Sequence, residues 1–458
     1  MRHATFYFCA TCLTSTIILF SSWAWALQTA PTPSATSAPA INSKELTQAA
    51  SALASKVPPF PIAGVSALGG RIFNIEPGIA IHSLAPFLQP GDEVRLLPGI
   101  HIPFLLADLH GTLEKPIVIR GYQTDTSKPL PYVKGELFSI SLLRPQHVIV
   151  RDLLAGNTTG PTVFVDGSLA ASPVVEETPL VANLNFINLQ IKQESQSPNQ
   201  SSIYLRSIEK VDLSNISIKG WNNSAVVMDN CKRVSVSKCT FDSAKTLPQY
   251  RGVAIRSGCE DISCMYVSFG IKVQVAFELG VCDTTNATEP VSQRPAQRIL
   301  ISHNAALECA CFVSLGSIDN SSIINNSIIE CAKYVFKADG ACGVPNFINF
   351  ENNLITWVPG RIELISKVAG GIPVESFRLG KNLWWSEELP AGFEIVGKPF
   401  GVELQPQLFD VNPNVEMRGF APVNPKARAF GWSSSTIQMP PPGSKTPLQS
   451  ESATQKPS

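Results

Sequence analysis

The sequence predicts an all-β protein built as a single-stranded right-handed parallel β-helix of about ten to twelve coils. Apolar residues or Asn recur at relative positions 0, +3, +5, +8 and +10, and nine copies of this spacing follow one another. Intervals of 22 to 37 residues between copies are typical of a solenoid whose coils carry insertions of variable length at one corner. The copies start at Pro145, Val181, Ile208, Cys231, Cys259, Ala296, Ile318, Pro345 and Val374.

The steps within this spacing have a direct structural meaning. A step of two keeps side chains on one face of a strand, whereas a step of three marks a bend that re-phases the inward face. Slot +8 holds Asn304, Asn326, Asn353 and Asn382 in the last coils and apolar residues in the earlier ones. An inward Asn can bond the amides and carbonyls of the coils above and below. The fixed register therefore predicts an asparagine ladder rather than four independent surface turns.

The composition is that of a globular chain with a large core. Of the 458 residues, 44% are hydrophobic and 16% are charged, which argues against disorder. The 36 Lys and Arg balance the 36 Asp and Glu, so no global field attracts nucleic acid or a membrane surface. Any anionic partner must be bound locally.

The two ends of the chain differ from its middle. Residues 1–26 resemble a secretory signal peptide with Ala24-Trp25-Ala26 as the cleavage site, so we expect export to the periplasm, the cell surface or the medium. No later stretch is long and apolar enough for a membrane span. We expect a Pro/Ala/Ser-rich lead-in with a capping helix over 27–64, the β-helix with its closing segment over 65–432, and a disordered tail over 433–458.

Nine cysteines follow the predicted signal peptide. Cys231 and Cys259 occupy slot 0 of adjacent coils, and Cys309 and Cys331 both lie at +13 of theirs. Each pair should stack at the strand spacing of about 4.8 Å, which is within disulfide range. Disulfides and buried thiols that serve as small apolar fillers are equally compatible with this pattern. Zinc is not expected, because no paired Cys or His spacing remains.

Three segments resemble known β-helix proteins. GDEVRLLPGIH (91–101) and GTLEKPIVIRGY (111–122) look like the opening coils of the chondroitinase-B-like and alginate-lyase-like group, polysaccharide lyase family 6, which has the pectin-lyase-like fold. The segment 406–432 resembles the closing segment of bacterial secreted β-helix proteins. The likeness covers roughly 65–432. It implies the fold, whereas activity depends on the residues of the site.

Four charged residues fall at nearly the same place in successive coils. Arg206, Asp229 and Arg294 lie five residues before slot +3, and Arg256 lies six before its own. Stacking in register predicts a column of net positive charge along one strand. Guanidinium groups bind carboxylates bidentately, so the column fits a uronate polymer. A ladder of surface salt bridges, each worth about 0–1 kcal/mol, explains the same pattern.

The family resemblance implies catalytic roles for two of these residues. Lyases of this family use a Lys base and an Arg in an Arg-x-Gly turn one coil later, and Arg256-Ser257-Gly258 resembles that turn. Arg256 would neutralise the uronate carboxylate while a base removes the C5 proton. The matching Lys position falls on Asp229, a departure from the family. A carboxylate beside Arg256 would be a poor base, so the base stays unassigned.

Other residues are candidates for substrate or calcium binding. Lys245, Arg251 and Lys272 supply basic groups near the column, although each is also explained as a solvated loop charge. Among the aromatic residues, Trp385 should point outward beside a core Trp384. The remaining aromatic candidates for a sugar platform are Trp221, Tyr250, Tyr266 and Trp357. The carboxylates that could bind calcium show no recognisable ligand spacing, and these are Glu260, Asp261, Glu278 and Asp283.

Together these features predict an exported polysaccharide-interacting β-helix protein. Its reaction, if it is an enzyme, would be β-elimination at an acidic, uronate-containing glycan. A non-catalytic surface or matrix scaffold or adhesin explains the same sequence. The sequence lacks a pair of glycosidase acids at recognisable spacing. It also lacks the nucleophile-elbow, P-loop and dinucleotide-binding motifs.

Overall fold

The computed structural model describes residues 60–123, 129–168, 180–193, 201–242, 249–270, 273–281, 294–338, 340, 342–357, 366–385 and 430–432. The predicted signal peptide, capping helix and tail, and most of the closing segment, lie outside these residues. So do Lys245, Lys272 and Asp283. The described residues belong to the compact unit Pro58–Ser458.

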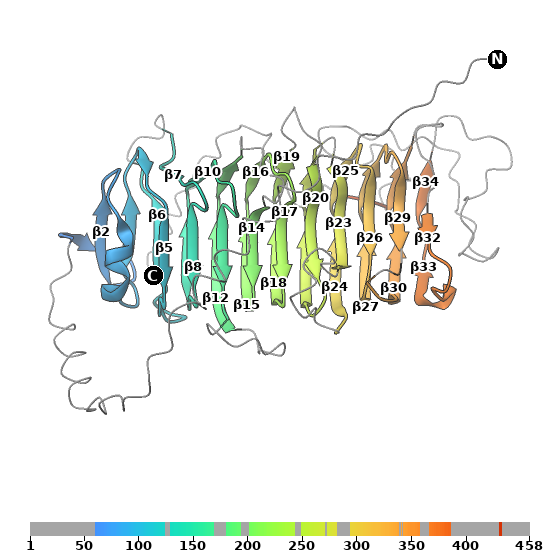
Figure 1. Ribbon diagram of the computed structural model, residues 1–458, viewed down its shortest axis with the longest axis horizontal. Coiled ribbons are helices and arrows are strands. Elements are labelled where there is room, and N and C mark those ends of the chain that lie inside the picture. The colour runs from blue at the N-terminus through green and yellow to red at the C-terminus, as the bar shows by residue number, and fades with distance from the viewer. Residues whose placement is uncertain are drawn as a thin grey trace, which may run out of the picture. The chain divides into compact units, whose positions relative to one another are not determined.

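The described strands form three long sheets, and from Glu93 onward each coil contributes one strand to each sheet in turn (Figure 1). Sheet A, with 13 strands, contains β1 (Ile62–Val65), β2 (Arg71–Ile75), β3 (Glu93–Leu96), β6 (Ile117–Gly121), β9 (Val148–Arg151), β12 (Leu180–Ile187), β15 (Ile208–Ser214), β18 (Lys232–Ser237), β21 (Glu260–Met265), β24 (Ala296–Ser302), β27 (Ile318–Ile324), β30 (Asn346–Glu351) and β33 (Phe377–Leu379).

Sheet B has 11 strands, and these are β4 (Ile100–His101), β7 (Tyr132–Lys134), β10 (Leu154–Gly156), β13 (Gln190–Lys192), β16 (Ser217–Lys219), β19 (Thr240–Asp242), β22 (Ser268–Phe269), β25 (Ala305–Leu307), β28 (Ser327–Ile329), β31 (Leu354–Thr356) and β34 (Leu383–Trp385). Sheet C has ten, and these are β5 (Phe104–Ala107), β8 (Ile140–Leu143), β11 (Val163–Asp166), β14 (Ser201–Arg206), β17 (Ser224–Asp229), β20 (Gln249–Arg256), β23 (Val273–Val281), β26 (Cys311–Leu315), β29 (Tyr334–Ala338) and β32 (Ser366–Val368).

This arrangement confirms the predicted parallel β-helix. Within the described strands only β1 pairs antiparallel, with β2, so sheet A agrees with the expected ten to twelve coils. The opening motifs form β3, β4 and β6, as the family resemblance implies. The described helices are two short 3-10 segments, η1 (Ile81–Phe87) and η2 (Val374–Ser376). No described helix has the length and apolar character needed to cross a membrane.

Successive coils stack in phase, as the spacing predicts. Val211 lies beside Val234, and Val234 lies beside Ile262, on neighbouring strands of sheet A. The slot-0 residues Ile208, Cys231 and Cys259 are fully buried in one core cluster.

A left-handed residue accompanies each step of three in every predicted copy except the one that starts at Val374. Lys210 (φ 61°) lies between slots 0 and +3 of its coil, and Asn215 (φ 54°) precedes slot +8. Such a residue turns the chain, so that an extra position is inserted without losing the inward face. The predicted slot 0 is wrong in one coil, because a bulge pairs Leu180 with Ile208 and leaves Val181 42% exposed.

The asparagine ladder is confirmed. The side-chain Nδ2 of Asn304 donates to Oδ1 of Asn326, Asn326 donates to Asn353, and Asn353 donates to Asn382, each over 3.0 Å. Each Oδ1 also accepts the backbone N–H of the preceding Asn at 2.9–3.0 Å. Every Nδ2 has a second acceptor in a backbone carbonyl. The ladder thus satisfies buried backbone groups along one corner of the last coils.

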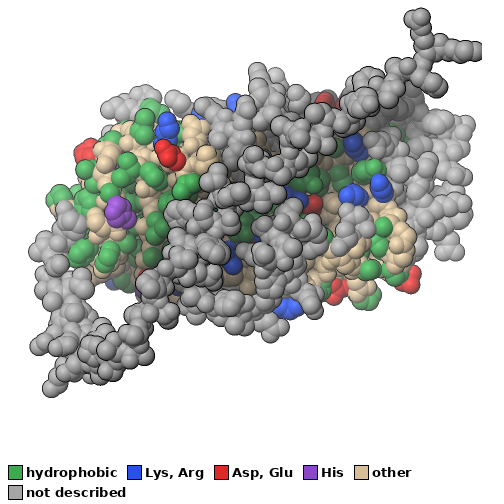
Figure 2. All heavy atoms as spheres, viewed as in Figure 1, with side chains coloured by type: hydrophobic (Ala, Val, Ile, Leu, Met, Phe, Trp, Pro, Cys, Tyr) green, Lys and Arg blue, Asp and Glu red, His purple; other side chains and the backbone are tan. Residues whose placement is uncertain are grey.

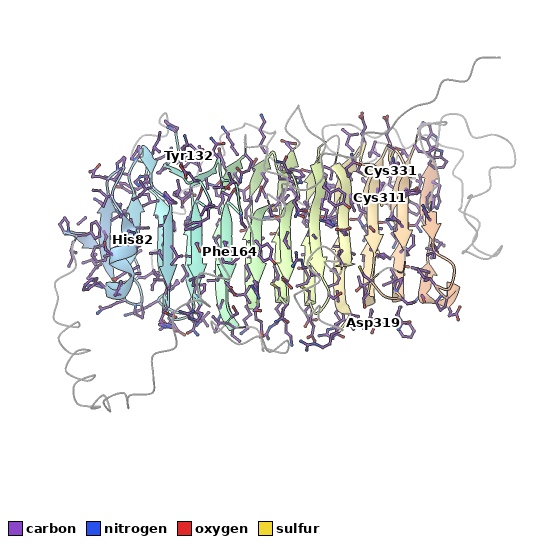
Figure 3. The ribbon with its side chains drawn as sticks, viewed as in Figure 1. His82, Tyr132, Phe164, Cys311, Asp319 and Cys331 are labelled. Atoms are coloured by element: carbon purple, nitrogen blue, oxygen red, sulfur yellow. The ribbon has the colours of Figure 1, made fainter. Side chains whose placement is uncertain are left out.

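The stacked cysteines are thiols in the structure, which is the second of the two alternatives. Cys231 and Cys259 are free and buried, and the backbone N–H of Cys231 contacts Sγ of Cys259 at 3.4 Å. The Sγ atoms of Cys309 and Cys331 are 3.6 Å apart, and Figure 3 labels Cys331 on the strand stack. Cys342 is disulfide-bonded. Thiols at slot 0 therefore fill the core as small apolar side chains.

Candidate functional site

Sheet C brings a tyrosine, a carboxylate and two arginines together at the ends of three adjacent strands. The register pairs Arg206 of β14 with Asp229 of β17, and Met228 with Ile255, so Arg256 follows beside Asp229. Tyr204 precedes Arg206 by two residues and therefore lies on the same face of β14. The predicted column is correct for Arg206, Asp229 and Arg256.

Three side chains of this group form a closed hydrogen-bonded triangle. The Tyr204 hydroxyl donates to Asp229 Oδ2 at 3.0 Å. Arg256 Nη1 donates to the Tyr204 hydroxyl and to Asp229 Oδ2, both at 3.0 Å. The guanidinium carbon of Arg256 also lies 5.5 Å from the centroid of the Tyr204 ring. We call Tyr204, Asp229 and Arg256 the sheet C triad.

The environment keeps Tyr204 protonated. Burial is the main cause that raises its pKa well above the ordinary value, and the negative charge of Asp229 raises it further. The ring packs at 5.9 Å from that of Phe164, which Figure 3 labels. A neutral phenol in this position can donate a proton but cannot serve as a base near neutral pH.

Arg206 extends the positive charge beyond the triad. Its side chain is exposed at the end of β14, between Asp166 and Asp229 in register. Within the described part of the chain its guanidinium makes no hydrogen bond or ion pair. Arg206 is therefore available to an external anion, two strands from Arg256. On the face shown in Figure 2, by contrast, the visible Lys and Arg side chains lie in small separate groups.

Arg294 does not continue the column. The register pairs Arg256 with Val281 of β23, after a shift at the end of β20. Arg294 lies beyond residues 282–293, two residues before β24. Its predicted place in the column was wrong because equal offsets from the next sheet A strand do not ensure equal positions in sheet C when an insertion intervenes.

Arg251 and the acidic calcium candidates are engaged with protein partners. Arg251 lies in β20, forms an ion pair with Glu278 and donates to Asn223 Oδ1 at 2.8 Å. Glu260 and Asp261 both pair with Arg298. Among the described residues, no three His, Cys, Asp or Glu side chains are grouped so that they could hold a metal ion.

Two of the expected aromatic platforms are instead core residues. Trp221 is 1% exposed and packs edge-on against Phe241, and Trp357 is 5% exposed and packs against Trp384. The expectation that they are exposed was wrong because both rings follow sheet B strands at corners that turn inward.

Trp385 is half-buried against the cluster of Leu354, Leu383 and Phe430. It lies in β34, four strands along sheet B from β22, which belongs to the coil of Arg256. At the strand spacing this is about 19 Å, so the structure does not bring Trp385 to the triad. Tyr250 is 46% exposed, and the Arg251 guanidinium lies 4.2 Å from its ring centroid.

Tyr204 is the member of the group that sequence reasoning missed. The available signal was its position two residues before Arg206, since alternate residues of a strand share a face.

Comparison with known proteins gives similarity in fold. No protein-family model matches the chain, and no curated protein matches it. Among solved structures, an alginate lyase from Paenibacillus sp. str. FPU-7 is 10% identical, with a TM-score of 0.40, over 68% of this chain and 98% of that one. A mannuronic acid specific polysaccharide family 6 lyase from human gut microbiota is 13% identical, with a TM-score of 0.35, over 72% and 92%.

A tailspike protein from Acinetobacter baumannii bacteriophage Fri1, a capsular polysaccharide depolymerase, is 10% identical, with a TM-score of 0.40, over 69% of this chain and 61% of that one. The likeness includes a family 6 polysaccharide lyase. At these identities it concerns the β-helix, and the named activities belong to those proteins.

Proposed function

We propose that this chain binds an acidic polysaccharide along sheet C at the sheet C triad. The observation that carries the proposal is Arg206, whose exposed guanidinium has no partner in the described residues and lies one strand from Asp229 and two from Arg256. Two guanidiniums, on strands separated by β17, provide bidentate sites for carboxylates that repeat along a polymer. Asp229 holds Tyr204 and Arg256 in place.

We further propose that the bound glycan is cleaved by β-elimination. Arg206 and Arg256 would neutralise the uronate carboxylate, which acidifies the C5 proton. As a base takes that proton, the C4–C5 double bond forms and the C4–O bond breaks. The neutral Tyr204 hydroxyl would then protonate the leaving glycosidic oxygen. The base itself stays unassigned, because Asp229 already accepts hydrogen bonds from both partners in the triad.

The ultraviolet absorbance of unsaturated uronates tests this proposal directly. We would follow it on alginate, chondroitin, pectin and heparin, with and without calcium. Arg256→Ala should lower kcat/KM at least about tenfold, as expected for the loss of a charged hydrogen bond of about 1.5–3 kcal/mol. Arg298→Gln serves as a matched control, since Arg298 is an ion-paired arginine of sheet A.

Two outcomes would change the assignment. Unchanged turnover in Arg256→Ala would remove the triad from the reaction. Absence of the absorbance signal on every polymer, with binding retained, would favour the alternative of a non-catalytic surface or matrix scaffold.

Export is part of the proposal and rests on residues 1–26. Fractionation of a native host, followed by amino-terminal sequencing of the mature chain, should give a start near Leu27. A chain that retains Met1 inside the cell would contradict export.

A further inference from the structure

Three arginines lie side by side on the outer face of sheet A. The register pairs Arg95 of β3 with Arg120 of β6, and Arg120 with Arg151 of β9. Adjacent strands are about 4.8 Å apart, so three guanidinium groups repeat along the axis of the coil stack. We call these three residues the arginine row. We propose that the arginine row is a second binding strip for an acidic polysaccharide, separate from the sheet C triad.

The row carries an excess of positive charge at its surface. Arg95 Nε lies 2.6 Å from Glu93 Oε1, and Arg151 Nε lies 2.7 Å from Asp152 Oδ2. Arg120 lies between them, 4.0 Å from Glu93 and 3.6 Å from Asp152. Two carboxylates therefore form ion pairs with three guanidiniums. The row has one more positive than negative charge, in a protein whose total charge is zero.

The acids lie beneath the bases. The side chains of Glu93 and Asp152 are 10% and 16% exposed, whereas those of Arg95, Arg120 and Arg151 are 23%, 34% and 35% exposed. The carboxylates thus anchor the row from below, and the surface offered to a ligand is cationic.

The orientation of Arg95 and Arg151 leaves the outer edges of their guanidiniums available. Each arginine of the row uses its Nε internally, since Arg95 and Arg151 bind carboxylates and Arg120 donates to the Gly121 carbonyl at 3.3 Å. Within the described ranges, the Nη atoms of Arg95 and Arg151 make no hydrogen bond, whereas Nη1 and Nη2 of Arg120 face Glu93 and Asp152 at 4.0 and 3.6 Å. The two Nη groups of a guanidinium form the fork that binds carboxylate, sulfate or phosphate bidentately.

Neighbouring side chains hold the guanidiniums of the arginine row in position before a ligand binds. The guanidinium of Arg95 lies 4.6 Å from the ring centroid of Tyr122. Asn188, one coil further on, donates to Asp152 Oδ1 at 2.8 Å. Because these contacts hold the charged groups without a ligand, binding would lose less side-chain entropy than it would on a loop.

The linear repeat selects the class of ligand. A polymer with an anionic group on successive units can lie along the axis of the coil stack and bind several arginines of the row, whereas a single small anion cannot. The absence of a global positive field argues against nucleic acid. The choice of an acidic glycan rests on the proposed function. The row lies on sheet A in earlier coils than the triad, so the two strips could engage one long chain with added avidity.

Titration calorimetry with a purified uronate oligosaccharide, at low salt, tests the row. The variant is Arg120→Gln, because it leaves the Arg95–Glu93 and Arg151–Asp152 pairs intact. We expect about tenfold weaker binding, equivalent to about 1.4 kcal/mol. Arg298→Gln should bind like the wild type, and neutral dextran should not bind measurably to any form.

The outcomes separate the row from the triad. If Arg120→Gln binds as tightly as wild type while Arg256→Ala is weakened, the arginine row is not a binding strip and the proposed function stands. If Arg120→Gln is weakened and Arg256→Ala is not, the row stands and the proposed site is wrong. If the wild type binds no acidic glycan, both proposals fall. Should Arg120→Gln not fold, Arg120→Lys retains the charge without the fork and should still weaken binding.

Discussion

Replacing Asn326 with Ala should destabilise the β-helix severely, because this side chain sits in the middle of the asparagine ladder. It is fully buried. Its Oδ1 accepts the backbone N–H and the side-chain Nδ2 of Asn304, at 2.9 and 3.0 Å. Its Nδ2 donates to the Ile301 carbonyl and to Asn353 Oδ1, both at 3.0 Å. Alanine removes all four bonds at once.

The magnitude follows from these contacts. A buried hydrogen bond contributes about 1 kcal/mol net, and a partner left unsatisfied costs about 1–3 kcal/mol. Four lost bonds therefore lower the free energy of unfolding by about 4 kcal/mol. This is a large share of the roughly 5–15 kcal/mol typical of a folded domain.

Urea denaturation measures the effect as a shift of the midpoint at constant slope. The matched control is Asn185→Ala, since Asn185 is a half-buried strand residue whose side chain makes no hydrogen bond within the described residues. That control should change the free energy of unfolding by less than about 0.5 kcal/mol. Equal shifts for the two variants would refute the account of the ladder as a set of stabilising buried hydrogen bonds.

Further predictions concern Tyr204, Cys239 and Gly156. Because the folded-state pKa of Tyr204 is raised above its unfolded value of about 10, the stability from the neutral phenol is complete below about pH 10 and is lost as the pH rises further. Tyr204→Phe should therefore lose less stability than wild type in alkaline urea titrations, and identical pH profiles would contradict this. Burial raises the pKa of the Cys239 thiol to about 12, so a thiol reagent at mildly alkaline pH should modify it only after denaturation; rapid modification of the native protein would show that the core opens readily. Gly156 has φ 152°, and a Cβ added there would overlap the Lys192 carbonyl, so Gly156→Ala should lower the melting temperature by several degrees, and an unchanged melting curve would mean that the Lys192 backbone moves to accommodate the methyl group.

The local spacing of residues was enough to predict the fold and much of the core. A spacing of inward residues is a local property of each coil, because it depends only on strand alternation and on one left-handed residue at each bend. For this reason the spacing alone predicts the stack of Ile208, Cys231 and Cys259 and the ladder from Asn304 to Asn382. The pairing of Arg206 with Asp229 followed from the same register.

Tertiary structure alone decided the contacts that depend on the corners. Bulges and insertions displace the register by single residues, and a shift of one residue moves a side chain to the opposite face of a strand. This is why Val181 is exposed and why Arg294 does not follow Arg256. Trp221 is a core residue because it follows a sheet B strand at a corner that turns inward. The arginine row was not predicted from the sequence, because its members are separated by 25 and 31 residues. Only the stacking of β3, β6 and β9 brings them together.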